Sequence, residues 1–237
     1  VAVSKTKPLH LLKSCYDTGH RHFGENYVQE VVEKAPQMPT DTHWHFIGPL
    51  QSNKVNKLVK SSWPSLYMVE TVASTKIADK LNKVVGELIA EGGGNSSSSS
   101  SSNGGDEGKA GDHGDAARTA PLKVMVQVNT SGEDAKSGLT PGDAVVELAR
   151  HVDGGDCAAL ELCGLMTIGR YGDTTTECFE SLVACREQVA GALGRDPQTL
   201  ELSMGMSGDF ESAIGLGSTN VRVGSTIFGS RDYSNRK

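Results

Sequence analysis

Lys5 has a residue type and a position that suit chemistry. It follows the short apolar run of residues 1–4 and comes shortly before Pro8. Because β-branched residues favour a strand and proline favours the first turn of a helix, Lys5 falls where a predicted strand ends and a loop begins. A lysine amine placed there can bind an anion or attack a carbonyl carbon. The competing interpretation is a solvated surface lysine.

Two loops near the end of the chain are rich in glycine and serine. Residues 203–207 read Ser-Met-Gly-Met-Ser, and Gly224 and Ser225 open a predicted short helix at 225–228. Small residues let backbone N–H groups approach an anion, and a helix N-terminus adds a favourable partial charge. Ser207, Gly224 and Ser225 are therefore candidate phosphate ligands, although glycine and serine are also ordinary turn residues.

Arg222 and His45 are further candidates. Arg222 shares a strand face with Gly224, and an inward-pointing arginine needs a partner because an unpaired buried charge is costly. It forms either a structural ion pair or a contact to an electron-rich part of a ligand. His45 is either a satisfied core histidine or a pocket residue. No second His, Cys or acid stands at ligand spacing, so we predict no metal site.

The elements that must position these residues alternate between strand and helix. Predicted strands cover residues 1–4, 20–24, 44–47, 66–70, 123–129, 160–168, 200–203 and 220–223. Predicted helices follow at 8–18, 25–35, 52–60, 74–90, 141–152 (with Thr140 at the N-cap), 174–193, 209–216 and 225–228. This pattern predicts an α/β fold, a (β/α)8 TIM barrel in a single domain over 1–237. An open doubly wound sheet is weaker, since no glycine-rich fingerprint follows the first strand.

In such a barrel the carboxyl ends of the strands share one face, where active sites lie. The polar residues predicted there include Lys5, Glu25, Asn26, His45, Glu70, Asn129, Met166 with Thr167, 203–207 and 222–225. A lysine facing a phosphate cradle across a barrel suggests covalent attachment of an aldehyde-bearing phosphate ligand, and pyridoxal phosphate is the obvious candidate.

Residues 91–120 interrupt the alternation. They are almost entirely Gly, Ser, Asn, Asp and Glu, with an unbroken serine run at 96–102. Such a segment buries too little apolar surface to offset its ordering entropy, so we predict a disordered insertion. Its place between a helix and the next strand puts it on the barrel face opposite the active site.

Composition limits the possible partners and compartments. The net charge is −6 without a basic cluster, which argues against nucleic acid, and no apolar run reaches the length of a membrane span. The five cysteines are odd in number and lack CxxC spacing, so we expect free thiols and a cytoplasmic location. Because the chain starts inside a predicted strand, we expect a missing N-terminal segment, which leaves organelle targeting open.

Motifs along the whole chain resemble one family. They are Val-Ala-Val-Ser-Lys5-Thr-Lys-Pro, Phe-Gly-Glu-Asn26-Tyr, Trp-His45-Phe-Ile-Gly-Pro-Leu-Gln, Gly-Leu-Met166-Thr-Ile-Gly, Leu-Ser-Met-Gly-Met-Ser207 and Gly-Ser-Thr-Asn-Val-Arg222-Val-Gly224-Ser225-Thr-Ile-Phe-Gly. In this order they resemble the pyridoxal phosphate homeostasis protein family. The resemblance implies the barrel of the alanine racemase N-terminal domain, fold type III, lacking here the N-terminal helix that closes the barrel floor.

The resemblance also implies roles for individual residues. Lys5 matches the lysine that forms the Schiff base with pyridoxal 5'-phosphate, whereas Lys7 matches the second lysine of that motif. Arg222 matches the arginine that faces the pyridine nitrogen. Ser207, Gly224 and Ser225 fall where the family binds phosphate, and the pocket-lining positions are Asn26, His45, Met166 and Met204.

Three classes of function remain. The first is a carrier that buffers the cofactor and supplies it to apoenzymes, without substantial catalysis. The second is an amino-acid racemase, which needs a base on each face of the substrate carbon. Lys5 supplies one base, and only Tyr27 and Tyr233 remain as unsupported candidates for the other. The third, a pure interaction protein, would not need the lysine and phosphate constellation. Because we expect no second domain that forms a dimer, we expect a monomer.

Overall fold

The computed structural model describes residues 1–93, 119–133, 136–170, 172 and 175–230. Its eight strands form one sheet in sequence order, and every neighbouring pair is parallel. They are β1 (Ala2–Val3), β2 (His22–Glu25), β3 (His43–Phe46), β4 (Leu66–Val72), β5 (Leu122–Gln127), β6 (Leu160–Met166), β7 (Glu201–Met206) and β8 (Asn220–Arg222).

The sheet closes on itself between its first and last strands. Ala2 forms a parallel bridge to Val223, and the N–H of Val3 donates to the carbonyl oxygen of Val223 at 2.8 Å. The N–H of Val223 donates in turn to the carbonyl oxygen of Val1 at 3.0 Å. These bonds confirm the predicted (β/α)8 barrel.

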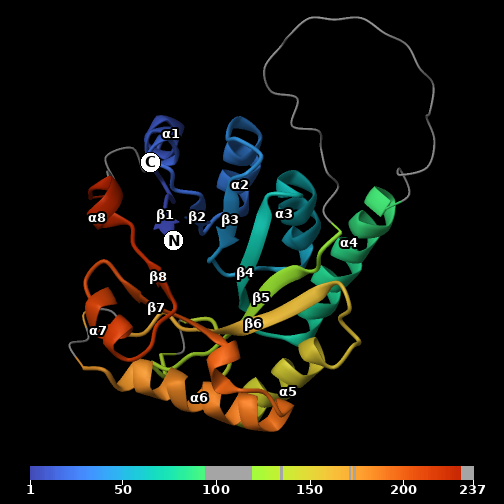
Figure 1. Ribbon diagram of the computed structural model, residues 1–237, viewed down its shortest axis with the longest axis vertical. Coiled ribbons are helices and arrows are strands. Elements are labelled where there is room, and N and C mark those ends of the chain that lie inside the picture. Colours follow the sequence, from blue (N-terminus) through green and yellow to red (C-terminus); the bar gives the residue numbers. More distant parts are fainter. Residues whose placement is uncertain (94–118, 134–135, 171, 173–174, 231–237) are drawn as a thin grey trace, which may run out of the picture.

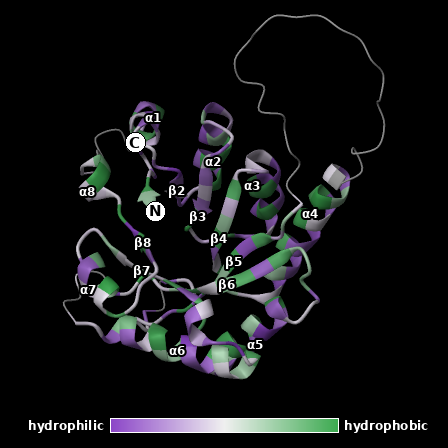
Figure 2. Ribbon diagram, in the orientation of Figure 1, coloured by the Kyte–Doolittle hydropathy of each residue, from purple (hydrophilic) through white to green (hydrophobic). Residues whose placement is uncertain are grey.

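Helices follow the strands and cover the outside of the sheet (Figure 1). They are α1 (Leu9–Asp17), α2 (Val28–Lys34), α3 (Val55–Ser62), α4 (Thr75–Gly93), α5 (Asp143–Asp153), α6 (Glu177–Leu193), α7 (Phe210–Gly215) and α8 (Ser225–Phe228). Figure 2 shows apolar and polar residues interspersed along the helices, as expected for helices with one face against a core. None of the described helices combines the length and the apolar character that a membrane span requires.

Side chains alternate between the two faces of each strand. One set, including Phe23, Trp44 and Leu165, packs in the main core of buried residues with the helices. The other set points into the barrel, where Met68, Met125, Cys163 and Met166 form a small apolar cluster. The barrel interior also holds buried polar side chains, among them His45, Glu70, Ser203 and Arg222. This polar interior is what positions the site.

Several predicted boundaries are wrong for local reasons. Strand β2 continues through Glu25, so the following helix begins at Val28 and not at residue 25. Gly142, with φ of 125°, precedes α5 in place of the predicted N-cap Thr140. Helix α4 continues to Gly93, so the insertion predicted at 91–120 begins with helical residues. Residues 94–118 of that insertion lie outside the described part of the chain.

Candidate functional site

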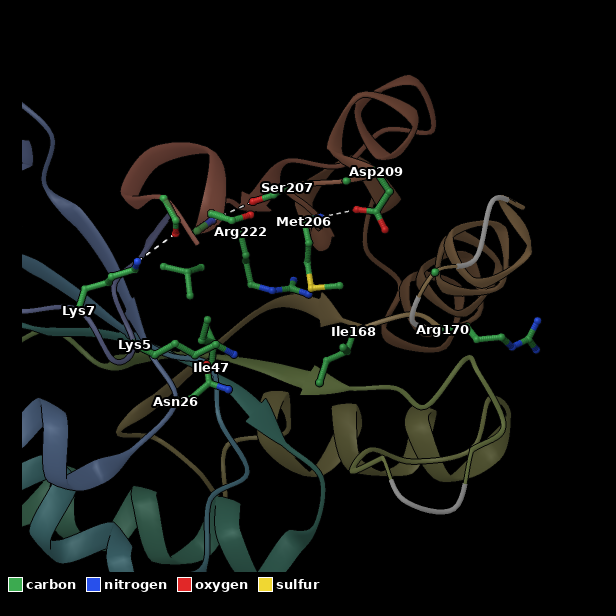
Figure 3. A pocket seen from close by; sticks show the side chains of 16 residues that line it. Lys5, Lys7, Asn26, Ile47, Ile168, Arg170, Met206, Ser207, Asp209 and Arg222 are labelled. Atoms are coloured by element: carbon green, nitrogen blue, oxygen red, sulfur yellow. Dashed lines mark hydrogen bonds between the residues drawn. The ribbon is translucent and has the colours of Figure 1, made fainter. Parts of the chain in front are cut away.

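A cavity of about 520 Å³ lies at the carboxyl ends of the strands. Its lining comes from the segments that follow β1, β2, β3, β6, β7 and β8. Of the nine predicted site residues, the structure brings these six into the lining: Lys5, Asn26, Ser207, Arg222, Gly224 and Ser225. Figure 3 shows that Lys5, Asn26 and Ile47 lie together on one side and that Arg222 and Ser207 lie on the other.

The two lysines of the first loop differ in their surroundings. Lys7 Nζ donates to the carbonyl oxygens of Phe228, Gly229 and Ser230 at 2.9, 3.0 and 2.7 Å. Its ammonium group thereby binds the carbonyl end of α8, where a positive charge is favourable. Lys5 extends into the cavity (Figure 3). The geometry therefore separates a lysine that ties the loop to α8 from one that can meet a ligand.

The loops after β7 and β8 approach each other closely. The N–H of Gly224 donates to Ser207 Oγ at 3.2 Å, and the N–H of Met206 donates to Asp209 Oδ1 at 2.5 Å. A Cβ atom at position 224 would lie 3.3 Å from the carbonyl oxygen of Val3, which is a tight contact. Glycine therefore suits this position, and Ser207, Gly224 and Ser225 line the same side of the cavity.

Arg222 is held from behind by a buried network. It is 4% exposed, and its Nη1 donates to Ser203 Oγ at 2.6 Å while Nη2 donates to the carbonyl oxygen of Thr167 at 2.6 Å. Ser203 Oγ donates in turn to Glu70 Oε2 at 2.5 Å. Burial lowers the pKa of Arg222, and the Glu70 charge opposes that shift. The guanidinium group therefore stays fixed at the cavity wall.

Glu70 collects further donors inside the barrel. Its Oε1 accepts from Asn220 Nδ2 at 3.0 Å and lies 2.7 Å from His45 Nδ1. Burial alone would raise the pKa of Glu70, but His45 and the Arg222 charge lower it to about 2. His45 Nε2 lies 2.8 Å from His22 Nδ1. Burial and the neighbouring His45 lower the pKa of His22 to about 4.

Three predicted lining residues lie outside the cavity wall. Met204 points toward the helices and packs in the main core, because it sits one residue from the inward-facing Ser203. Met166 lies inside the barrel in the methionine cluster, fully buried. His45 is 3% exposed and supports Glu70, as its interpretation as a satisfied core histidine predicted. Glu25, predicted at the ligand face, points instead toward α2, where it pairs with Lys34.

Sequence reasoning missed other lining residues, among them Ile168 and Asp209. Met206, which lies in the predicted stretch 203–207, reaches the cavity because the β7–β8 register shifts between Ser203 and Met206, which a strict alternation cannot anticipate. Asp209 precedes α7 and accepts from the Met206 backbone, so its place near a helix start was the available signal.

The lining suits an anionic ligand with polar groups. Lys5 faces the cavity from one side and Arg222 from the other, beside the glycine and serine loops, and Asp209 is the acid among the described lining residues. Asn26 Oδ1 is buried and has no hydrogen-bond partner among the described residues, so it is suited to a polar group of a ligand. An amine for an aldehyde, a guanidinium group for a ring nitrogen and a cradle for phosphate fit pyridoxal phosphate.

One possible metal-ligand group exists among the described residues. Asp79 Oδ1 and His151 Nε2 form an ion pair at 2.6 Å, and Cys157 supplies a third ligand atom within 4.8 Å of both. These residues belong to α4, α5 and the segment after α5, and none of them lines the cavity.

Comparisons with known proteins agree with this geometry. The model of the alanine racemase N-terminal domain matches residues 1–232. The pyridoxal phosphate homeostasis protein of Bos taurus is 45% identical, with 100% of this chain and 78% of that protein covered. The protein of the same name from Haemophilus influenzae is 37% identical, with 99% and 85% covered.

Solved structures show the same barrel. PipY of Synechococcus elongatus with PLP bound has a TM-score of 0.70 and 30% identity, covering 97% of this chain and 91% of that one. An alanine racemase of Clostridium difficile has a TM-score of 0.65 at 14% identity, covering 97% and 51%, and so shows the fold alone. On its sequence relatives and on the matching domain model, the chain belongs to the pyridoxal phosphate homeostasis protein family.

Proposed function

We propose that this protein binds pyridoxal 5'-phosphate reversibly at Lys5 and so carries and buffers the cofactor. The observation that carries the proposal is the cavity in which Lys5 and Arg222 lie on opposite sides beside the loops of Ser207 and Gly224. The relatives named for pyridoxal phosphate homeostasis support it. We also propose that residues 1–237 are one cofactor-binding domain with an insertion at 91–120.

Each residue has a separate task in this proposal. When bound, pyridoxal phosphate would supply an aldehyde, and the Lys5 amine would hold it through a bond that water can reverse. Ser207, Gly224 and Ser225 hold the phosphate. Arg222 would face the pyridine nitrogen, and its positive charge would disfavour protonation of that nitrogen and weaken the ring as an electron sink.

The lining supports a carrier more than a racemase. Racemisation needs a second base on the far face of the substrate carbon. Tyr27 is 47% exposed, and no tyrosine stands among the described residues that line the cavity. Tyr233 lies outside the described residues.

Partners and compartment follow as further proposals. We propose that the recipients are pyridoxal-phosphate-dependent apoenzymes, because a reversible attachment suits delivery. We also propose that the protein is a monomer. The five free cysteines support a cytoplasmic location.

Absorbance and mass spectrometry test the binding site. Purified protein mixed with pyridoxal phosphate should show a visible band that borohydride bleaches, and the reduced cofactor should be found on Lys5. Lys5→Ala should lose both signals. Lys13→Ala is the matched control, because Lys13 is exposed on α1. A reduced adduct on another lysine in the wild-type protein would disprove the assignment.

A turnover assay tests the carrier interpretation. The loaded protein should not racemise amino acids at rates typical of enzymes, about 1 per second or more. Turnover at that rate, lost in Lys5→Ala, would replace the carrier with the racemase.

A further inference from the structure

The chain on both sides of Lys5 is tied to the end of β2 and to helix α2. Ser4 Oγ donates to Glu25 Oε1 at 2.6 Å, and the carbonyl oxygen of Ser4 accepts from Lys34 Nζ at 2.9 Å. On the other side, the N–H of Thr6 donates to Glu30 Oε2 at 2.7 Å. The two neighbours of Lys5 are therefore both anchored by charged side chains.

Lys34 joins these anchors into one cluster. Besides Ser4, its ammonium group donates to Glu25 Oε1 at 2.8 Å and to Glu30 Oε2 at 2.6 Å. An ammonium group has three N–H donors, and here all three have partners. Lys34 is only 8% exposed and Glu25 is fully buried, so the bonds of Lys34 to Glu25 and to Ser4 are shielded from water, whereas Glu30 is partly exposed. We call Glu25, Glu30 and Lys34 the α2 clamp.

The anchored segment is a strained turn. The N–H of Lys7 donates to the carbonyl oxygen of Ser4 at 3.0 Å, which places Lys5 and Thr6 at the turn's two central positions. Thr6 has φ of 62° and is the one non-glycine residue with positive φ in the described part of the chain. A β-branched residue in this region is unfavourable and persists only when the surrounding contacts hold it. The α2 clamp supplies such contacts next to Lys5.

We propose that the α2 clamp is a positioning device for Lys5 and that Glu25 is its adjustable member. Ionised Glu25 holds Ser4 and Lys34 together, whereas neutral Glu25 loses its ion pair with Lys34. Glu25 Oε2 has no hydrogen-bond partner among the described residues, so no donor opposes its protonation. The inference rests on cofactor binding at Lys5 and assigns supporting roles to three residues outside the cavity.

The charge environment of Glu25 agrees with this role. Burial raises the pKa of Glu25 to about 7, while Lys34 and the Ser4 hydroxyl act to lower it and Glu30 acts to raise it. The charged groups that face it are thus Lys34 and Glu30, both on α2. Protonation between about pH 8 and pH 6 would loosen the turn, so Lys5 should hold its ligand less well at the lower pH.

The rate of cofactor release tests the inference. The full chain is loaded with pyridoxal phosphate, and excess alkaline phosphatase destroys whatever cofactor dissociates while the visible band is followed at pH 6 and pH 8. Glu25→Gln mimics the neutral side chain. At pH 8 it should release the cofactor about tenfold faster than wild type, since one charge-assisted bond is worth roughly that factor. At pH 6 the two proteins should agree.

The lysine that carries the label after borohydride reduction provides a second test of how Lys5 is positioned. After borohydride reduction, peptide mass spectrometry should find the label on Lys5 alone in the wild-type protein, and partly on Lys7 when the clamp is broken. Glu30→Ala removes the acceptor for the Thr6 N–H and should show the same spread. Lys34→Arg should preserve the labelling pattern better than Lys34→Met. Glu33→Gln is the matched control, an exposed carboxylate on the same helix.

The outcomes separate two failures. If the wild-type protein takes up no reducible cofactor, the proposed function fails. If the wild-type protein loads normally while Glu25→Gln and Glu30→Ala match it in release rate and labelling at both pH values, the positioning role is wrong. Thermal unfolding identifies a variant that does not fold. Because Glu30 is partly exposed, Glu30→Ala then decides the question alone.

Discussion

Glu25 and Glu70 are both fully buried near the cavity, yet their pKa values are shifted in opposite directions. The pKa of Glu25 is raised to about 7, and that of Glu70 is lowered to about 2. Glu25 lies between the sheet and α2, on the Lys5 side, whereas Glu70 lies inside the barrel behind Arg222. Burial alone therefore does not decide the charge of a carboxyl group in this protein.

The number of donors on each oxygen explains the difference. Ser4 and Lys34 both bond to Oε1 of Glu25, and Oε2 has no partner in the described structure. Both oxygens of Glu70 are bonded, Oε2 by Ser203 and Oε1 by Asn220 and His45. Hydrogen bonds to the charged form favour it. Glu70, behind Arg222, thus stays ionised, whereas Glu25, on the Lys5 side, changes its charge near neutral pH.

Removing the charge of Glu70 should have the largest effect. Glu70→Gln leaves the buried Arg222 guanidinium without its counter-charge, so the free energy of unfolding at pH 7 should fall by about 3 to 5 kcal/mol. Urea unfolding measures this loss, with Glu33→Gln as an exposed control. The folded-state pKa of Glu70 lies below the ordinary value of 4.5, so its contribution exists above pH 4.5 and is lost as pH falls toward 2. A constant deficit at all pH values would contradict this account.

Neutralising Glu25 should change the free energy of unfolding in the opposite direction. Its folded-state pKa lies above the ordinary 4.5, so ionisation costs stability progressively as pH rises from about 4.5 to about 7. Glu25→Gln removes that cost and should be more stable than wild type at pH 8 by up to about 3 kcal/mol, with no difference near pH 4.5. Greater stability with faster cofactor release would show that the ionised clamp favours function over stability.

At each pH, the free energy of unfolding of the variant must be compared with that of the wild-type protein at the same pH. The lowered pKa of His22, about 4, makes stability fall as pH decreases from about 6.5, in the same window as Glu25 but with opposite slope. Subtracting the two unfolding curves removes this shared contribution. If Glu25→Gln and Glu70→Gln gave differences of the same sign at pH 8, the contrast between the two carboxyl groups would be refuted.

The serines that contact the two carboxyl groups should show the same contrast, with a smaller change in the free energy of unfolding. Ser203→Ala leaves Arg222 Nη1 and Glu70 Oε2 without a partner, and should cost about 2 kcal/mol of unfolding free energy. Ser4→Ala leaves Glu25 Oε1 bonded to Lys34 and should cost about 1 kcal/mol. Denaturant unfolding of both variants checks the order, and the reverse order would mean that Glu25 depends on Ser4 more than its bonds indicate.

Thr6→Gly should have the smallest effect on stability. Glycine relieves the strain of φ 62° but gains freedom in the unfolded chain, so the free energy of unfolding should change by less than about 1 kcal/mol. Cofactor release should nevertheless accelerate, because the turn that presents Lys5 loosens. Thr18→Gly, in the exposed segment after α1, is a control for the substitution itself.

The barrel could be read from the sequence because its signal is repeated. Eight apolar strands alternating with helices predict the same architecture even when single boundaries shift, as at the start of α2. The order of strand ends then places Lys5, Arg222 and Gly224 on one face, as the cavity shows. Position along a strand was therefore enough to predict which loops meet.

The finer assignments failed where regular alternation fails. The β7–β8 pair has a register irregularity between Ser203 and Met206, so Met206 reaches the cavity although strict alternation from Ser203 would turn it outward. The α2 clamp was not predicted, because the contact of Lys34 with Ser4 depends on how a helix packs behind a strand. Such contacts join residues that no local pattern relates.

The seam between β8 and β1 has a consequence for motion. Lys5 follows one of these strands and Gly224 the other, so a ligand that touches both spans the seam where the barrel closes. A ligand that binds only the closed form makes opening of that seam rarer by mass action. The amide hydrogens of Val3 and Val223, which cross the seam, should therefore exchange with deuterium more slowly once the cavity is filled.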